Sequence, residues 1–157
     1  VILTFVSMLD FCLMNIRVSK QFTFEMAHAL HGYEGPCKNI HGHSYQLTVC
    51  LIGQPVSEKT SENGMVIDFG NLKKIVNEKI IHEFDHSLVL NNTYPFQLPL
   101  NEAFGKVHFV DFQPTCENLL VEFKNRLSSV NFNGAILHSI LLRETNSSFA
   151  EWYLNDN

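Results

Sequence analysis

The chain has 157 residues, of which 45% are apolar and 13 are phenylalanine, so a single domain with a sizeable buried core is the simplest expectation. Its 16 acidic and 11 basic residues give a formal net charge of −5, and no basic run occurs. Because generic binding to nucleic acid needs a basic surface, this composition argues against a nucleic-acid partner.

The first thirteen residues are apolar, but they have no basic start and are too short to span a bilayer, so we expect no membrane association. We interpret residues 1–13 as an upstream extension, Met14 as the natural start, and residues 14–157 as one domain. The cysteines are widely spaced without a CxxC pair, which predicts reduced thiols in a cytoplasmic protein: Cys12, Cys37, Cys50 and Cys116.

The first half of the chain predicts two strands joined by a loop. Residues 16–26 alternate well enough for a strand that ends just before His28. Residues 31–40 contain two glycines and a proline and predict a loop. Residues 44–52 are rich in strand-forming side chains and predict the second strand.

The second half predicts helices and a closing pair of strands. Residues 65–69 predict a short strand, and apolar spacing over 71–81 predicts a helix. Residues 87–113 contain several Asn, Pro and Gly residues, and we expect them to be irregular. Thr115 is a predicted N-cap for a second helix. The last two strands are predicted at 135–143 and 150–154.

This order of elements predicts an α+β domain, in which two helices pack on one face of an antiparallel sheet. Such a small sheet leaves exposed edge strands, which favour the joining of subunits edge to edge. We therefore expect an oligomer.

The most informative segment runs from Cys37 to His43 and ends in His-Gly-His. On a strand His41 and His43 point to the same face, and His28 can supply a third imidazole. Three nitrogen ligands with an open fourth position are typical of a catalytic zinc site. His31 is the alternative third ligand. The nearby thiol of Cys37 is a candidate base or nucleophile.

A second motif, His82-Glu83-Phe84-Asp85-His86, matches the HExxH pattern of zinc metalloproteases. On a helix, His82 and His86 would share a face and Glu83 would be the base. The motif lacks its confirming context, although this alternative remains open. Asp85 and His86 have a different candidate role if they lie next to Cys37. An imidazole that is oriented by a carboxylate can share the proton of a thiol, so the three side chains would form a base system.

Glu144 follows an apolar strand. A carboxylate in this place is either a solvated strand end or an anchor for two parallel N–H donors of a planar heterocycle. The pattern alone favours the solvated interpretation.

Taken in order, these motifs resemble the 6-pyruvoyl-tetrahydropterin synthase / 6-carboxytetrahydropterin synthase family, from about residue 16 to the C-terminus. The matching motifs are FEMAH ending at His28, Cys37-x-x-x-His41-Gly-His43, Gly64-Met-Val-Ile-Asp68-Phe, Asp85-His86, Pro114-Thr-Cys-Glu117-Asn and Glu144-Thr.

The resemblance implies a tunnelling fold (T-fold), in which the sheets of three subunits close a barrel and two trimers form a hexamer. It also implies active sites at subunit interfaces and dihydroneopterin triphosphate as the substrate. It assigns roles residue by residue: His28, His41 and His43 hold Zn²⁺; Cys37 is the general base, tuned by Asp85 and His86; and Glu144, Thr115 and Glu117 form the pterin pocket.

The family has three product branches. Lys38 stands where the folate branch has Glu, three residues before the first His of HGH, which argues against that branch. The short spacing from Cys37 to His41 resembles the bacterial carboxy branch, which leads to queuosine and releases acetaldehyde. The alternatives are the pyruvoyl branch of biopterin synthesis, the HExxH metalloprotease, and a paralogue that binds pterin or zinc without turnover.

Overall fold

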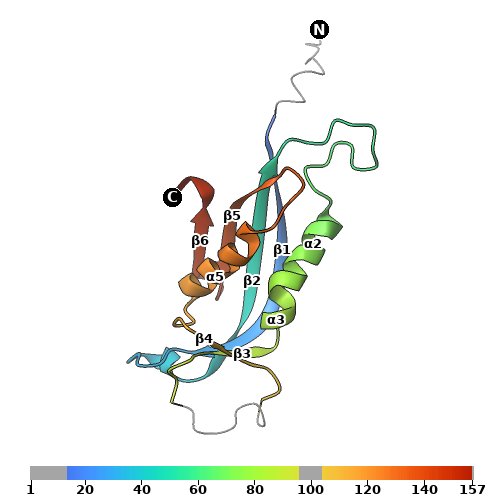
Figure 1. The fold of residues 1–157 in the computed structure, drawn as a ribbon. Helices are drawn as coiled ribbons and strands as arrows, with labels where there is room; N and C mark the ends of the chain where they lie inside the picture. Colours follow the sequence, from blue (N-terminus) through green and yellow to red (C-terminus); the bar gives the residue numbers. More distant parts are fainter. Residues whose placement is uncertain (1–13, 96–103, 157) are drawn as a thin grey trace.

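The protein is described by a computed structural model that covers residues 14–95 and 104–156. In that part of the chain, six strands form one sheet in the order β4-β3-β1-β2-β5-β6. The long strands β1 (Ile16–Ala29) and β2 (His41–Gly53) form an antiparallel hairpin at its centre. The helices lie on one face of this sheet (Figure 1). The predicted extension, residues 1–13, lies outside the described residues.

The sheet is mixed, so the prediction of an antiparallel sheet is wrong in this respect. β5 (Ile136–Arg143) and β6 (Phe149–Tyr153) extend it antiparallel, as the closing strands were predicted to do. On the other side, β3 (Ser87–Asn91) runs parallel to β1, and β4 (Val107–Val110) runs parallel to β3. These two strands lie within 87–113, which was predicted to be irregular. They were missed because each is short and is flanked by turn-forming residues.

The first helical segment is longer than the predicted 71–81. It consists of α2 (Phe69–Val76), a π-helical turn η2 (Asn77–Ile81) and α3 (His82–Phe84). The strand predicted at 65–69 is absent, because this segment turns into the helix. The side chain of Asp68 accepts a hydrogen bond of 2.8 Å from the backbone N–H of Asn71 and thereby caps α2.

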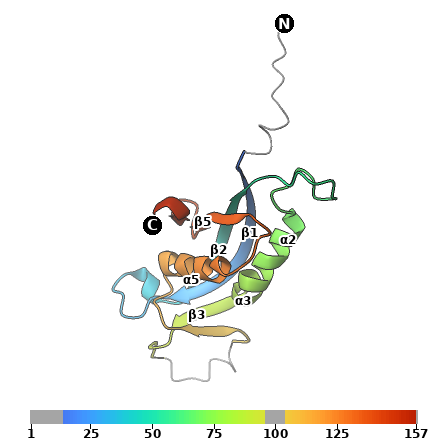
Figure 2. The ribbon, with the colours of Figure 1, turned by 45° about the horizontal axis from the view of Figure 1, so that its top comes forward.

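The second helix is α5 (Cys116–Ser128), and the prediction of Thr115 as its N-cap is confirmed by a hydrogen bond from the Asn118 N–H. Figure 2 shows α5 beside α2 and α3, all over the central strands. No helix in the described ranges is long and apolar enough to cross a membrane.

The core lies between these helices and the sheet. Even-numbered residues of β1 and odd-numbered residues of β2 point toward the helices, as alternation on a strand requires. Phe24 and Tyr45 lie opposite each other in this row, and their rings stack with centroids 5.2 Å apart. The same row continues toward the end of the hairpin, where histidines replace the apolar side chains.

Candidate active site

Three histidines share the core face at one end of the central hairpin. β1 includes His28, which therefore lies within the strand rather than past its end, opposite His41 in the register. His43 lies two residues further along β2, opposite Met26. The potential ligand atoms of the three imidazoles lie within 4.8 Å of one another. The structure thus brings together the three side chains that the sequence predicts as a metal site.

Hydrogen bonds hold two of these rings in the form that binds a metal. Nδ1 of His28 lies 2.6 Å from the carbonyl oxygen of Pro114, and Nδ1 of His41 lies 2.8 Å from that of Asn39. Because a carbonyl oxygen only accepts, each Nδ1 must carry the proton, and each Nε2 is left with a lone pair. A backbone carbonyl commonly fixes a metal-binding histidine in this way.

The buried Nε2 of His28 has no hydrogen-bond partner among the described residues. It faces Oε1 of Glu144 at 3.5 Å, and Nε2 of His43 lies 3.8 Å from the same oxygen. Two acceptors that face each other repel unless a proton, a water or a metal ion lies between them. Burial lowers the pKa of both His28 and His43, which favours the neutral imidazole over the protonated one. The donor set therefore fits a metal ion, and three imidazoles favour zinc over magnesium or calcium.

A cavity of about 250 Å³ lies next to this cluster and collects most of the other predicted site residues. Cys37 enters it from a short 3-10 turn (Pro36–Lys38), and the backbone carbonyl of Cys37 accepts a 2.9 Å hydrogen bond from Leu30. His28 and the predicted pterin-pocket residues also line it: Thr115, Glu117 and Glu144. Thr115 and Glu117 stand at the start of α5, so the same helix end presents both side chains and, through Pro114, orients His28.

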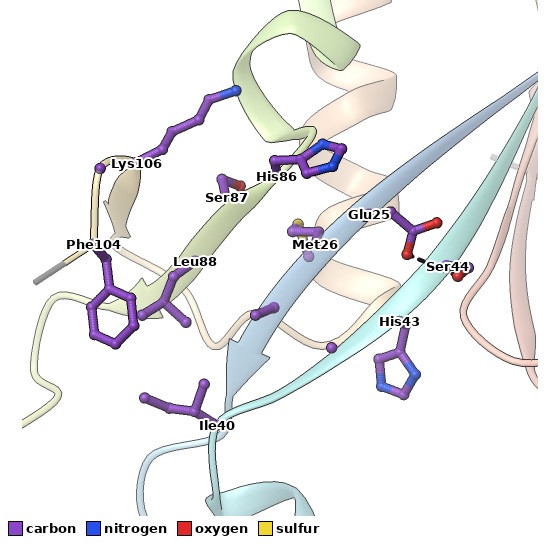
Figure 3. Close-up of a pocket in the computed structure, with 13 residues that line it drawn as sticks. Glu25, Met26, Ile40, His43, Ser44, His86, Ser87, Leu88, Phe104 and Lys106 are labelled. Carbon is purple, nitrogen blue, oxygen red and sulfur yellow. Dashed lines mark hydrogen bonds between the residues drawn. The ribbon is translucent and has the colours of Figure 1, made fainter.

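Asp85 and His86 lie elsewhere in the chain. His86 lines a different cavity of about 580 Å³, together with His43, Glu25 and Lys106 (Figure 3). Cys37 does not line that cavity, and neither Asp85 nor His86 lines the cavity of Cys37. Within the single chain, the structure therefore does not bring the predicted base and its partners together.

Hydrogen bonds nevertheless hold Asp85 and His86 in a defined arrangement. His86 has a left-handed backbone (φ 57°), and its N–H donates to the carbonyl of Glu25. The Glu25 N–H donates to Oδ1 of Asp85, which lies 2.9 Å from Nδ1 of His86. Burial acts to raise the pKa of Asp85, but the Glu25 N–H and the His86 ring outweigh it and hold that pKa below its ordinary value. The ammonium of Lys106 donates to the Asp85 carbonyl at 2.7 Å.

The HExxH motif does not form a metalloprotease site. The helix ends at Phe84, so His82 and His86 do not share a helical face. The Glu83 carboxylate forms a two-pronged ion pair with the guanidinium of Arg126, which lowers the pKa of Glu83. A carboxylate held in this way packs α3 against α5 and is not a free base.

His31, the alternative third ligand, is not part of the cluster. Its ring packs against Tyr94, and its backbone exchanges two hydrogen bonds with the side chain of Gln113. Sequence reasoning missed one residue at the site, Tyr45, which is fully buried and donates a 3.1 Å hydrogen bond to Glu144. Its position two residues after His43 on the same strand face was the available signal.

The fold and the histidine cluster together define a T-fold protein with a candidate metal centre. The chain belongs to the 6-pyruvoyl tetrahydropterin synthase family, whose family model matches residues 17–155. The members of this family are enzymes, and the residues of the candidate site all lie within the matched range.

Curated relatives agree with this assignment. The 6-carboxy-5,6,7,8-tetrahydropterin synthase of Haemophilus influenzae is 35% identical over 140 residues, covering 87% of this chain and 97% of the relative. The protein of the same name from Aquifex aeolicus is 34% identical, covering 88% of this chain and 98% of the relative.

Solved structures support the fold. An uncharacterized protein from Wolinella succinogenes superposes with a TM-score of 0.73 at 20% identity, covering 90% of this chain and 99% of the other. The 6-pyruvoyl tetrahydropterin synthase of Caenorhabditis elegans has a TM-score of 0.64 at 24% identity, covering 89% and 96%.

Proposed function

We propose that this protein converts 7,8-dihydroneopterin triphosphate and water to 6-carboxy-5,6,7,8-tetrahydropterin, with release of triphosphate and acetaldehyde. The observation that carries the proposal is the cluster of His28, which is buried, with the partly buried His41 and His43, beside a cavity that holds a thiol and a carboxylate. The names of the curated relatives favour the carboxy product. We further propose a cytoplasmic enzyme that acts in queuosine synthesis.

His28, His41 and His43 would hold a zinc ion through their Nε2 atoms. When bound, the zinc ion would act as a Lewis acid toward the side-chain hydroxyls of the substrate and lower their pKa. The protein contributes the orientation of the rings, since the carbonyls of Pro114 and Asn39 fix two of the three tautomers.

Cys37 would act as the general base on the side-chain carbons of the substrate, with His86 and Asp85 relaying protons. Since one subunit keeps Cys37 and His86 in different cavities, we propose that they meet across a subunit interface, in a hexamer built as a dimer of trimers. Glu144 would accept hydrogen bonds from the amino and ring N–H groups of the pterin, and Thr115 and Glu117 would complete that pocket.

A product assay tests the reaction. Zinc-loaded protein is given dihydroneopterin triphosphate, the pterin products are identified by mass spectrometry, and acetaldehyde is trapped in parallel. Carboxytetrahydropterin together with acetaldehyde would confirm the proposal. Pyruvoyl-tetrahydropterin without acetaldehyde would assign the protein to the biopterin branch, and no consumption of substrate would contradict both assignments.

One variant separates an enzyme from a paralogue that only binds. Cys37→Ala should abolish turnover while zinc content and pterin binding stay close to those of the wild type. Cys116→Ala is the matched control, because Cys116 lines the same cavity but its thiol donates to the carbonyl of Leu142. Full turnover by Cys37→Ala would refute the role of this thiol.

A further inference from the structure

Tyr45 occupies the place where the apolar core meets the histidine cluster. Its side chain is fully buried, and its ring stacks on Phe24 with an interplanar angle of 11°. On its other side the ring meets His28 and His43 in edge-on contacts, with centroids 6.2 and 5.6 Å away. One side chain thus touches the core and two of the proposed zinc ligands.

The hydroxyl of Tyr45 donates to Oε1 of Glu144 at 3.1 Å. A carboxylate oxygen accepts hydrogen bonds, so the phenol hydroxyl is the donor in this pair. A buried hydroxyl without a partner is costly, so this hydrogen bond is strongly retained. Among the described residues, only this hydroxyl donates a hydrogen bond to the Glu144 side chain.

The backbone around Glu144 is fixed separately. The Glu144 N–H donates to the carbonyl of Ser148, as does the N–H of Thr145, so the turn after β5 sets where the side chain begins. The carboxylate itself is held by the hydrogen bond from Tyr45, with the imidazoles of His28 and His43 further away, at 3.5 and 3.8 Å from the same oxygen. An oxygen of a carboxylate has two acceptor sites, so Oε1 can accept from the phenol and from a ligand together.

We propose that Tyr45 is a positioning residue, which orients the carboxylate of Glu144 for the planar N–H donors of the pterin and aligns it with the histidine cluster. This inference rests on the proposed role of Glu144 in pterin binding. Under this proposal Tyr45 contributes to pterin recognition and is not only a residue of the hydrophobic core.

The test uses Tyr45→Phe, which removes the hydroxyl and keeps the ring that packs on Phe24 and the histidines. We expect the Kd of 7,8-dihydroneopterin, measured by fluorescence titration of the zinc-loaded protein, and the KM of the triphosphate substrate to rise about tenfold, which corresponds to about 1.4 kcal/mol. Zinc content and kcat should change less than twofold. The control is Tyr153→Phe, which removes the hydroxyl of an exposed side chain that donates a hydrogen bond to Glu151. This variant should change neither the Kd of dihydroneopterin nor the KM of the substrate.

A double-mutant cycle with Glu144→Gln separates this inference from the proposed function. If Glu144→Gln binds dihydroneopterin as tightly as the wild type, the proposed role of Glu144 fails, and the role of Tyr45 fails with it. If Glu144→Gln weakens binding but Tyr45→Phe does not, only the role of Tyr45 is overturned. Tyr45→Phe should add almost nothing in the Glu144→Gln background, and fully additive losses would overturn the proposal. Loss of zinc by Tyr45→Phe would also overturn it, since that result indicates a structural role.

Discussion

Replacing His28 by alanine should remove most of the stabilisation of this protein by zinc. Binding of a ligand at one hundred times its Kd stabilises the folded state by about 2.7 kcal/mol. A protein of 157 residues gains roughly 3 °C in Tm for each kcal/mol, so zinc should raise the Tm of the wild type by about 8 °C. His28→Ala keeps only two of the three imidazoles and should show a shift of less than about 2 °C at the same zinc concentration.

The metal-free proteins should differ much less. The variant loses the buried hydrogen bond from His28 to Pro114, but it also loses an Nε2 atom that has no partner. These effects oppose each other, and each amounts to about 1–3 kcal/mol. The apo forms should therefore unfold within a few degrees of each other.

Differential scanning calorimetry with and without zinc measures both quantities, and elemental analysis gives the bound metal. His31→Ala is the matched control, because His31 follows His28 closely in the sequence but its ring packs against Tyr94, outside the cluster. The reasoning is refuted if His28→Ala keeps the full zinc-dependent shift. It is equally refuted if His82→Ala empties the metal site, a result that would restore the HExxH interpretation.

Three further predictions concern single side chains. Iodoacetamide should label Cys37 before Cys116, because burial raises the pKa of Cys116 to about 12, and peptide mapping should show a modified Cys116 only after unfolding. The pKa of Asp85 is lowered in the folded state, so its charge stabilises the protein at neutral pH. This contribution is lost as the pH falls below about 4. In urea unfolding, the difference in free energy of unfolding between the wild type and Asp85→Asn should therefore shrink as the pH is lowered through this range. Arg126→Met should lower the free energy of unfolding by about 1–2 kcal/mol, because it leaves the half-buried carboxylate of Glu83 unpaired, and an unchanged value would show that this ion pair contributes nothing.

The sequence predicts the part of the site that depends on local alternation. His41 and His43 are two residues apart on a strand, so their common face follows from strand geometry alone. Their approach to His28 depends on the register of β1 against β2, which a sequence does not state but which the loop between the strands determines. The N-cap at Thr115 was equally predictable, because capping is a local interaction.

The missed features depend on contacts between distant segments. β3 forms a strand because it pairs in parallel with β1. No local pattern distinguishes such a short buried strand from a loop that contains apolar residues. The partnership of Tyr45 with Glu144 joins residues 99 positions apart, and Tyr45 alone has the pattern of an ordinary core residue. The sequence likewise does not show that Cys37 and His86 line different cavities, because this depends on the fold of the whole chain.

The position of the histidine cluster on the core face explains why the site and the stability of the hairpin are connected. A strand that alternates toward a covered face ordinarily places apolar side chains there. His28 and His43 take two such positions, and the buried Nε2 of His28 has no hydrogen-bond partner among the described residues. The cost is local, since it falls on the end of β1 and β2 beyond the packed aromatic pair Phe24 and Tyr45. A metal ion would supply the missing partner, so the residue that makes this end of the sheet less stable without metal is one of the three proposed to bind it. Rigid aromatic packing on one side and an unsatisfied nitrogen on the other are what a preformed, selective metal site requires.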